Sequence, residues 1–388
     1  MTIQSDHPTL EAARALQSEL ASRAAEMEEV RRLPADLAAK LAEGGLFKMI
    51  LPSAYGGLEC TPKQIVDAVE AVAEANASAG WCVMIGATAA MNAAYMAPDF
   101  ATEIYDSSST ITGGVFAPMG KAVVDGDDYI VSGRWQWGSG SANCTWLCCG
   151  SMVFEDGELR TLPNGRPDAR MMYFPAEEAE LIDTWHVMGL KGTGSGDIAV
   201  ENIRVPKGRS VSLVADKPVI DGALFKFPAF GLLSLGVAAT AMGNAKGALQ
   251  AFTDLAVAKK NQGSRKTLSE RATIQSETAR MTAQFRAARA YLHDEIEQTW
   301  EIAQISDDIP VERRAALRMA CTHMVRTGAD ICRTCYDLGG GAALFEASDL
   351  QRRFRASHAM TQHIVTAPAT WELTGRLLFG LPTDASMV

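Results

Sequence analysis

The stretch MGLKGTGSGDIAVENIRVP, Met188–Pro206, decides how this chain is divided. Its second half, DIAVENIRVP, has the short apolar period of a β-strand and ends a region, from about Ser108 to Leu213, that contains other such runs between Gly, Asp and Pro turns. The other runs are AVVDGDDYIVSG, TWLCCGSMVF and ARMMYFP. On both sides of this region the apolar residues recur at helical spacing instead. The sequence thus predicts a β domain between two helical regions.

Helical periodicity runs from Pro8 to about Tyr105 and returns after Pro218 in long blocks with little Pro or Gly. We therefore predict an α+β fold with a helical N-terminal domain (residues 1–107), a central β-barrel-like domain (108–217) and a C-terminal four-helix bundle (218–388). The predicted bundle helices are Phe230–Asn261, Leu268–Ala303, Pro310–Leu338 and Ser348–Phe379.

Composition limits the class of function. A chain of 388 residues that is 47% hydrophobic can bury a large core. A net charge of −10 without a long basic run argues against a nucleic-acid partner. Its eight cysteines lack the spacing of a secreted disulfide framework, and no run reaches the ~18–20 apolar residues that span a bilayer. We expect a cytoplasmic protein without a membrane partner, acting on small molecules or other proteins.

Several familiar motifs are absent. The fragment GLKGTGSGD misses the third glycine of a dinucleotide-binding turn, and Gly114–Lys121 has one residue too many for a phosphate loop. No G-x-S-x-G elbow is present. Cys332 and Cys335 have the spacing of a redox or zinc half-site, but no second pair exists, so we interpret them as core residues. No metal site is expected.

The segment RRFRASHAMTQH, Arg352–His363, places two of only six histidines in a basic, helical stretch after a glycine turn. Histidine titrates nearest neutrality, so a histidine lining a pocket can hold or pass a proton. On one regular helix His358 and His363 would lie about 140° apart, so they would not face one metal together. Capping a helix or filling an interface is the alternative for each.

The order of helical domain, β domain and bundle resembles the acyl-CoA dehydrogenase superfamily over almost the whole chain. The fragments that carry the resemblance are LPSAYGGL (Leu51–Leu58), SAGW (Ser78–Trp81), GRWQWGSGSAN (Gly133–Asn143), Met188–Pro206 and the glycine turn before RRFRASH. The resemblance implies a flavin, FAD or FMN, held between the β domain and the bundle. It also implies a homotetramer built as a dimer of dimers.

The resemblance assigns cofactor contacts to particular residues. Ser139 falls where a hydroxyl touches the flavin N5 edge, and the small neighbour Gly140 lets the backbone come close. The pair Ala117 and Met119 resembles a flavin-contacting segment, and Trp81 is placed against the cofactor. The alternatives are a turn serine at 139 and a core tryptophan at 81.

A second set of contacts is implied near the end of the bundle. Arg265 resembles the arginine that reaches flavin phosphate across the dimer interface, where its planar fork suits phosphate oxygens. Gly340 and Gly341, in the glycine turn, are assigned to the cofactor on the same resemblance. A solvated surface arginine is the alternative for Arg265.

The branch of the superfamily is indicated by the absence of the glutamate that dehydrogenases use as a base. Dehydrogenases carry a glutamate base in a Tyr-Glu-Gly run, but the equivalent place here falls on His363 and Ile364. The R-x-x-HA-x-x-x-H pattern resembles two-component flavin-dependent monooxygenases that hydroxylate 4-hydroxyphenylacetate, a secosteroid phenol or dibenzothiophene. That branch implies O2 as co-substrate and reduced flavin, FADH2 favoured over the reduced form of FMN, from a separate NAD(P)H flavin reductase. It also implies a C4a-hydroperoxyflavin that hydroxylates or epoxidises a small aromatic substrate, with Ser139 and His363 catalytic.

The sequence also bears on the substrate. Phenol-hydroxylating relatives carry a histidine that accepts the phenolic proton, but Gly86–Tyr95 contains none, which favours an indole-like ring. His358 is predicted to be structural or to contact the flavin pocket from a neighbouring face. Two alternatives stay open: a dehydrogenase-like FAD enzyme acting on a CoA thioester with a relocated base, and a non-enzymatic flavin-storage or interaction module.

Overall fold

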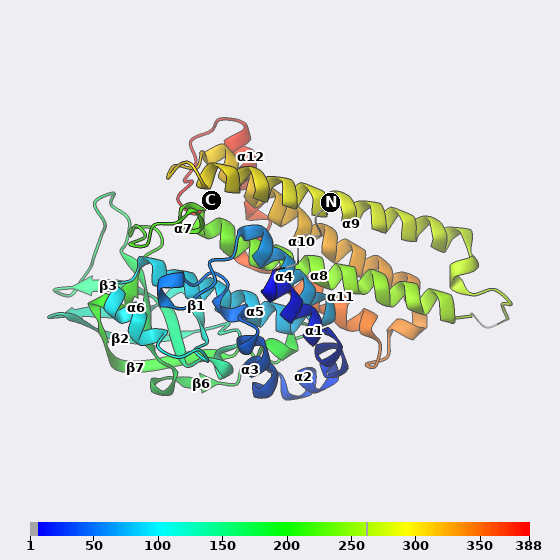
Figure 1. Ribbon diagram of the computed structural model, residues 1–388, viewed down its shortest axis with the longest axis horizontal. Helices are drawn as coiled ribbons and strands as arrows, with labels where there is room; N and C mark the ends of the chain where they lie inside the picture. Colours follow the sequence, from blue (N-terminus) through cyan, green and yellow to red (C-terminus); the bar gives the residue numbers. More distant parts are fainter. Residues whose placement is uncertain (1–6, 261–262) are drawn as a thin grey trace.

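The computed structural model describes residues 7–260 and 263–388. Its N-terminal helices pack beside the long helices that follow the sheet (Figure 1). These N-terminal helices are α1 Pro8–Ser22, α2 Ala24–Val30, α3 Ala35–Glu43, α4 Pro62–Ala75, α5 Ala77–Ala90 and α6 Pro98–Ile104. Local sequence sets their starts: Thr61 and Gln64 form a capping box on α4, and Asn76 caps α5 by accepting from the N–H groups of Ser78 and Ala79.

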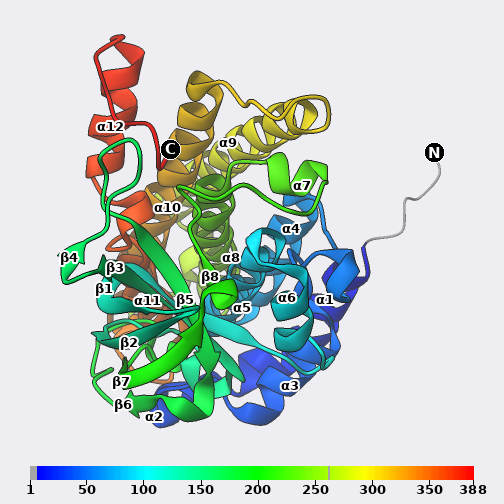
Figure 2. The ribbon, with the colours of Figure 1, turned by 90° about the vertical axis from the view of Figure 1, so that its left-hand side faces the viewer.

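The middle of the chain forms one mixed sheet, which faces the viewer in Figure 2. Its strand order is β6-β7-β2-β1-β3-β5-β8, with β4 on β3; β1 and β3 run parallel and the other pairs are antiparallel. No described residues pair β6 with β8, so hydrogen bonds do not close the sheet into a full barrel. The strands are β1 Thr112–Asp125, β2 Asp128–Trp135, β3 Trp146–Glu155, β4 Glu158–Leu159, β5 Ala169–Pro175, β6 Glu180–Ile182, β7 Asp197–Pro206 and β8 Ser210–Val211.

Strand β1 contains both Gly114–Lys121 and the predicted flavin segment. Its register against β3 shifts between Val115 and Gly120, so Ala117 and Met119 lie in an irregular stretch that loosens the pairing. Gly114 has φ 153°, and a Cβ there would lie 1.8 Å from the carbonyl oxygen of Cys148. This glycine serves a close strand contact, so the fragment is not a phosphate loop.

The C-terminal region differs from the prediction in one place. The predicted fourth helix, Ser348–Phe379, is broken into α11 and α12, because Pro368 cannot continue a helix through its own position and the chain turns extended at His363. The expected 140° separation therefore does not apply, since the two histidines do not share a helix. The observed helices are α7 Ala223–Lys226, α8 Ala229–Ala258, α9 Ala272–Ala303, α10 Val311–Gly339, α11 Asp349–Met360 and α12 Ala369–Leu378.

The predicted fold class is confirmed: helices, a central mixed sheet and helices again follow one another along the chain. Helix α8 is the centre of the assembly, since it packs against α4, α5, α10 and α11 and carries a long buried stretch from Phe230 to Ala248. Every helix in the described part of the chain is too short or too polar to cross a membrane. Because α5 lies between α8 and β1, it carries side chains to the junction of bundle and sheet.

Candidate active site

A chain of hydroxyl groups joins the sheet to α5 at this junction. The Trp81 indole N–H donates to Ser139 Oγ at 3.1 Å. Ser139 Oγ lies 2.7 Å from Ser195 Oγ, which lies 2.6 Å from Thr193 Oγ1. Thr193 in turn donates to the Leu190 carbonyl at 2.8 Å. All three hydroxyl residues are buried. Removing one of them therefore leaves its partner without a hydrogen bond, which costs free energy of folding.

His363 lies beside the same tryptophan. Its ring meets Trp81 edge to face, with centroids 5.5 Å apart and planes at 71°. The Val365 backbone N–H donates to Nδ1 at 3.4 Å, so the neutral ring carries its proton on Nε2. Burial, and then the positive charge of Arg318, lower the pKa of His363 to about 4. At neutral pH this imidazole is uncharged, and the structure brings Ser139, Trp81 and His363 together as one cluster.

No carboxylate of the described residues pairs with His363. Burial and Arg318 are the causes of its pKa shift, and no carboxylate of the described chain contributes. The proton acceptor that a thioester dehydrogenase requires is therefore missing from this position.

His358 has different surroundings. Its ring packs edge to face on Phe354, with centroids 4.6 Å apart, and Phe354 stacks on Tyr336. Its Nε2 is buried without a partner among the described residues. These contacts favour the structural role over the flavin contact, although both stay predictions.

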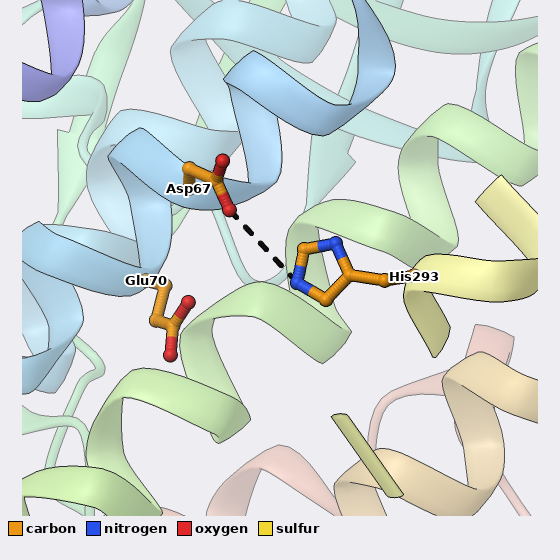
Figure 3. A group of neighbouring side chains, drawn as sticks. All are labelled: Asp67, Glu70 and His293. Carbon is orange, nitrogen blue, oxygen red and sulfur yellow. Dashed lines mark ion pairs between the residues drawn. The ribbon is translucent and has the colours of Figure 1, made fainter. Parts of the chain in front are cut away.

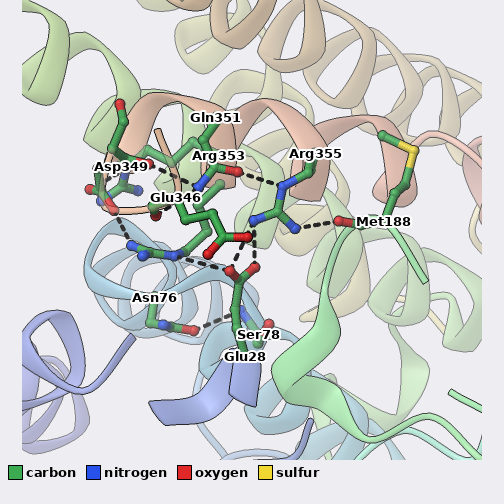
Figure 4. A network of polar contacts seen from close by, with 11 residues as sticks. Glu28, Asn76, Ser78, Met188, Glu346, Asp349, Gln351, Arg353 and Arg355 are labelled. Atoms are coloured by element: carbon green, nitrogen blue, oxygen red, sulfur yellow. Dashed lines mark hydrogen bonds and ion pairs between the residues drawn. The ribbon is translucent and has the colours of Figure 1, made fainter. Parts of the chain in front are cut away.

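The arginines before His363 bind the N-terminal domain (Figure 4). Arg355 donates to Glu28 at 2.8 and 2.9 Å and to the carbonyl of Met188. Arg353 donates to Asp349 at 3.0 Å and to a carbonyl at the end of α4 at 2.8 Å. These bonds fix α11 against α2, α4 and the loop before β7, and so set where the chain leaves α11.

A second anchor holds the segment that carries His363. Arg326 on α10 donates to the carbonyls of Thr361 and Thr366 at 3.0 and 3.1 Å. The exit from α11 is therefore tied on both sides of the histidine, and its ring is held in place by backbone contacts of its neighbours.

Large apolar side chains are exposed in the irregular stretch of β1 and just after β2. Phe116 is 37%, Met119 40% and Trp137 60% exposed, whereas Ala117 is half-buried. A planar, largely apolar ring system laid against this face would cover them while meeting a hydroxyl at Ser139. The hydroxyl of Ser139 and the exposed apolar surface therefore fit a flavin ring.

The remaining predicted cofactor residues lie elsewhere. Arg265, Gly340 and Gly341 are exposed, and the Lys259 ammonium donates to the Gly339 carbonyl at 2.7 Å, which joins their two loops at one tip. Gly340 lies 14 residues beyond Arg326 on α10, which is about 20 Å along a helix. Figure 1 shows this tip at the end of the bundle away from the sheet. Within one chain, these residues do not reach the Ser139 cluster.

Sequence reasoning missed three members of the site: Thr193, Ser195 and Arg318. The first two lie in the fragment GLKGTGSGD, which was considered only for its glycines; a hydroxyl at alternate positions between glycines was the available signal. Arg318 is buried on α10 in a run of apolar neighbours, and a charge on the apolar face of a helix was the signal there.

A separate polar cluster joins Asp67 and Glu70 on α4 to His293 on α9 (Figure 3). His293 Nε2 lies 3.9 Å from Asp67, while Arg289 donates to Glu70 at 3.0 Å and lies 3.7 Å from Asp67. Burial, and then Arg289, lower the pKa of His293 to about 4. Because Arg289 pairs with Glu70 and Lys63 pairs with Asp67, each carboxylate already has a cation, and we interpret the cluster as an ion-pair network between helices.

Known proteins match this architecture. The acyl-CoA dehydrogenase N-terminal domain model matches residues 9–103 and the C-terminal domain model matches residues 235–368. Indole-3-acetate monooxygenase of Pseudomonas putida is 29% identical over 365 residues, 92% of this chain and 90% of that protein. The flavin-dependent monooxygenase oxygenase subunit HsaA of Mycobacterium tuberculosis is 30% identical over 392 residues, 95% of each chain. The structure of 3-HSA hydroxylase from Rhodococcus sp. RHA1 superimposes with a TM-score of 0.89 at 27% identity, covering 98% of this chain and 99% of that one.

The fold and the acid-free site define a protein of the acyl-CoA dehydrogenase superfamily. Within it, the chain belongs to the flavin-dependent monooxygenases, as an oxygenase component that uses reduced flavin and O2. An oxygenase component depends on a separate flavin reductase and acts on an aromatic substrate. The alternatives of a thioester dehydrogenase and a flavin-storage module are thereby set aside.

Proposed function

We propose that this monooxygenase oxygenates an indole-like ring in preference to a phenol, with Ser139 and His363 as the catalytic residues at the flavin. The observation that carries the assignment of Ser139 is the direction of hydrogen bonding along the hydroxyl chain. Bound reduced flavin supplies the activation of O2, and the residues of the chain position it and manage protons.

The direction follows from the fixed end of the chain. Thr193 donates its proton to a carbonyl, so Thr193 Oγ1 must accept from Ser195. Ser195 Oγ then accepts from Ser139, whose own proton is used. Ser139 Oγ also accepts from Trp81, which leaves it one lone pair and no free proton. A group that only accepts suits the N5–H of reduced flavin better than the bare N5 of oxidised flavin.

Replacing Ser195 tests this direction. In Ser195→Ala, Ser139 regains a free proton and can donate to oxidised flavin, so the preference for reduced over oxidised flavin falls, about 5- to 10-fold. Anaerobic titration with each flavin state measures the ratio of dissociation constants. Ser195→Thr retains the hydroxyl and serves as the control; an unchanged ratio in Ser195→Ala contradicts the proposed direction.

His363 offers a neutral Nε2–H at the same junction. A neutral imidazole donates one hydrogen bond without placing a charge beside the cofactor, and it can return a proton during turnover. Ser139 and His363 both contact Trp81, and of the two Ser139 accepts hydrogen bonds whereas His363 Nε2 donates.

The preference for an indole-like ring rests on α5 and the 3-10 turn after it. Thr88 donates its hydroxyl to the carbonyls of Met84 and Ile85, and Asn92 donates to Tyr173; neither a hydroxyl nor an amide takes up a phenolic proton. The name of the Pseudomonas putida relative, indole-3-acetate monooxygenase, agrees with this preference. A product screen with indole and simple phenols, a flavin reductase and NADH tests it. Turnover of phenols alone refutes it.

We also propose a cytoplasmic dimer of dimers. The tip that carries Arg265, Gly340 and Gly341 is about 20 Å further along α10 than the His363 segment. If both bind one flavin, the tip must come from another copy. Arg265→Met is then expected to weaken flavin binding without changing the monomer fold, which flavin titration and light scattering measure. A fully active monomer contradicts the proposal. All eight cysteines are free thiols, as reducing conditions would keep them.

A further inference from the structure

We propose that Arg318 is the anchor for a carboxylate on the aromatic substrate, so that the enzyme acts on aryl-acetate-type acids rather than on the bare ring. This inference rests on the proposed function and adds the chemical class of the substrate's side chain. Arg318 belongs to α10, and its guanidinium hydrogen-bonds to Ser234 and Phe230 on α8.

The first observation is that this buried charge has no counter-ion. Arg318 is 6% exposed, and its Nη1 donates to Ser234 Oγ at 2.8 Å and to the Phe230 carbonyl at 3.4 Å. Its Nε is buried without a partner, and no carboxylate of the described chain lies within ion-pair distance of it. A buried arginine remains protonated and is costly without an anion.

The other arginines near the site show how unusual this is. Arg353 and Arg355 each bind a carboxylate and a backbone carbonyl. Arg289, between α4 and α9, binds Glu70. Arg326, beside His363, also binds carbonyls alone, but it is half-buried; Arg318 is the most buried of the five, and its partners are neutral.

The second observation is the set of groups around Arg318. Its charge is close enough to His363 to lower the pKa of that imidazole. Its carbonyl partner, Phe230, meets Phe116 of β1 edge to face with centroids 5.5 Å apart. A cation, two aromatic rings and a neutral proton donor therefore converge where sheet and bundle meet. A planar acid places its ring among the aromatic side chains and its carboxylate on the guanidinium fork.

The anion could instead be the reduced flavin. However, the flavin N5 edge is assigned to Ser139, whereas the guanidinium of Arg318 is hydrogen-bonded to Phe230 and Ser234 on α8. Arg318 thus lies between α8 and α10, apart from the hydrogen bonds of the Ser139 cluster, which favours the substrate. Reduced flavin is retained as an outcome that the test distinguishes.

The experiment compares a charged ligand with a neutral one of the same shape. Indole-3-acetate and indole-3-acetamide are titrated calorimetrically into the full-length protein, with and without anaerobically reduced flavin. We expect the wild type to bind the acetate at least 10-fold more tightly than the amide. In Arg318→Met we expect the acetate to bind about 10- to 100-fold more weakly and the amide to stay within about twofold.

Two further variants keep the result interpretable. Arg318→Lys retains the charge without the fork, so an intermediate loss is expected. Arg333→Met removes an exposed arginine of the same helix, whose carboxylate partner Asp330 is also exposed, and should change neither ligand. If Arg318→Met does not fold, the ratio of acetate to amide affinity in Arg318→Lys still decides.

Three results overturn the proposal. One is equal weakening of both ligands, which assigns Arg318 a structural role. Another is a wild type that shows no preference for the acetate or binds neither ligand. The third is a variant in which only reduced flavin binds more weakly. Product analysis separates the two proposals. If indole is oxygenated but the acetate is not preferred, the role of Arg318 is wrong and the proposed reaction stands. If acetate binding depends on Arg318 but no arene is oxygenated, the proposed reaction is wrong and the role of Arg318 stands.

Discussion

The two halves of the segment Arg352–His363 are adjacent in sequence and opposite in chemistry. In the first half, Arg353 binds Asp349 of its own helix and a carbonyl of α4, and Arg355 binds Glu28 of α2. In the second half, His363 stands outside any helix, faces an indole ring and has no acid near it. The arginines hold the segment, and the histidine is left free to act.

The difference teaches which substitutions should affect stability and which should affect chemistry. A residue whose hydrogen bonds all end on protein groups stabilises the fold, because its loss strands buried partners. The segment that carries His363 is held by Arg326 through the carbonyls of Thr361 and Thr366. Replacing the His363 side chain therefore leaves these bonds in place. Four predictions follow from this contrast, from the largest effect to the smallest.

His363→Asn should lower the rate of product formation and leave the fold intact. Loss of a positioned proton donor costs about 10²-fold in rate, so we expect that drop in product formation at equal flavin occupancy, with more H2O2 released per O2 consumed. Oxygen consumption and product analysis measure both. Gln362→Ala, at the exposed neighbour, is the control. Unchanged product yield would remove His363 from the mechanism.

Ser139→Ala should have a smaller effect on chemistry and a measurable one on stability. The change strands the buried Trp81 N–H and the acceptor side of Ser195, which costs about 1–2 kcal/mol. We expect about a 10-fold loss of product per reduced flavin. Ser132→Ala, on β2, removes hydrogen bonds with Asn202 away from the cluster and should leave the product per reduced flavin unchanged. Equal behaviour of the two variants contradicts the assignment.

Arg355→Met should show the reverse pattern. Removing the guanidinium leaves Glu28 with one distant partner, Arg352 at 3.7 Å, so we expect a loss of about 1.5 kcal/mol in the free energy of unfolding. The ratio of product to H2O2 should stay within about twofold. Urea unfolding gives the first quantity, and Arg333→Met is its surface control. A large fall in the ratio of product to H2O2, with an unchanged free energy of unfolding, would contradict the structural role of Arg355.

The pH dependence of stability should carry the smallest signal. The unfolded chain takes up a proton on His363 near pH 6.5, but the folded chain does so only near pH 4. Stability is therefore fully present above about pH 6.5 and is lost as the pH falls toward 4. Between pH 7.5 and about 5.8, the wild type should lose about 1 kcal/mol more than His363→Asn. Parallel pH profiles would show that the imidazole is not desolvated.

Parts of this architecture were legible in the sequence for simple reasons. The structure has strands at Ala169–Pro175 and Asp197–Pro206 and the long bundle helices, as predicted. Residues that are buried at a regular spacing are apolar at the same spacing, so the sequence shows the period. The break in the last helix was missed, although Pro368 was its signal. The irregular pairing of β1 was missed too, since register depends on the partner strand.

By itself, the sequence determined the class: a helical, β and helical order, a superfamily resemblance and a missing glutamate where His363 lies. The tertiary structure alone decided how the residues act. It joined Thr193, Ser195, Ser139 and Trp81 into a chain with a fixed direction. It also left Arg318 buried without an acid. Proton direction and charge pairing depend on distances of a few ångströms between segments far apart in the chain, and no local pattern encodes them.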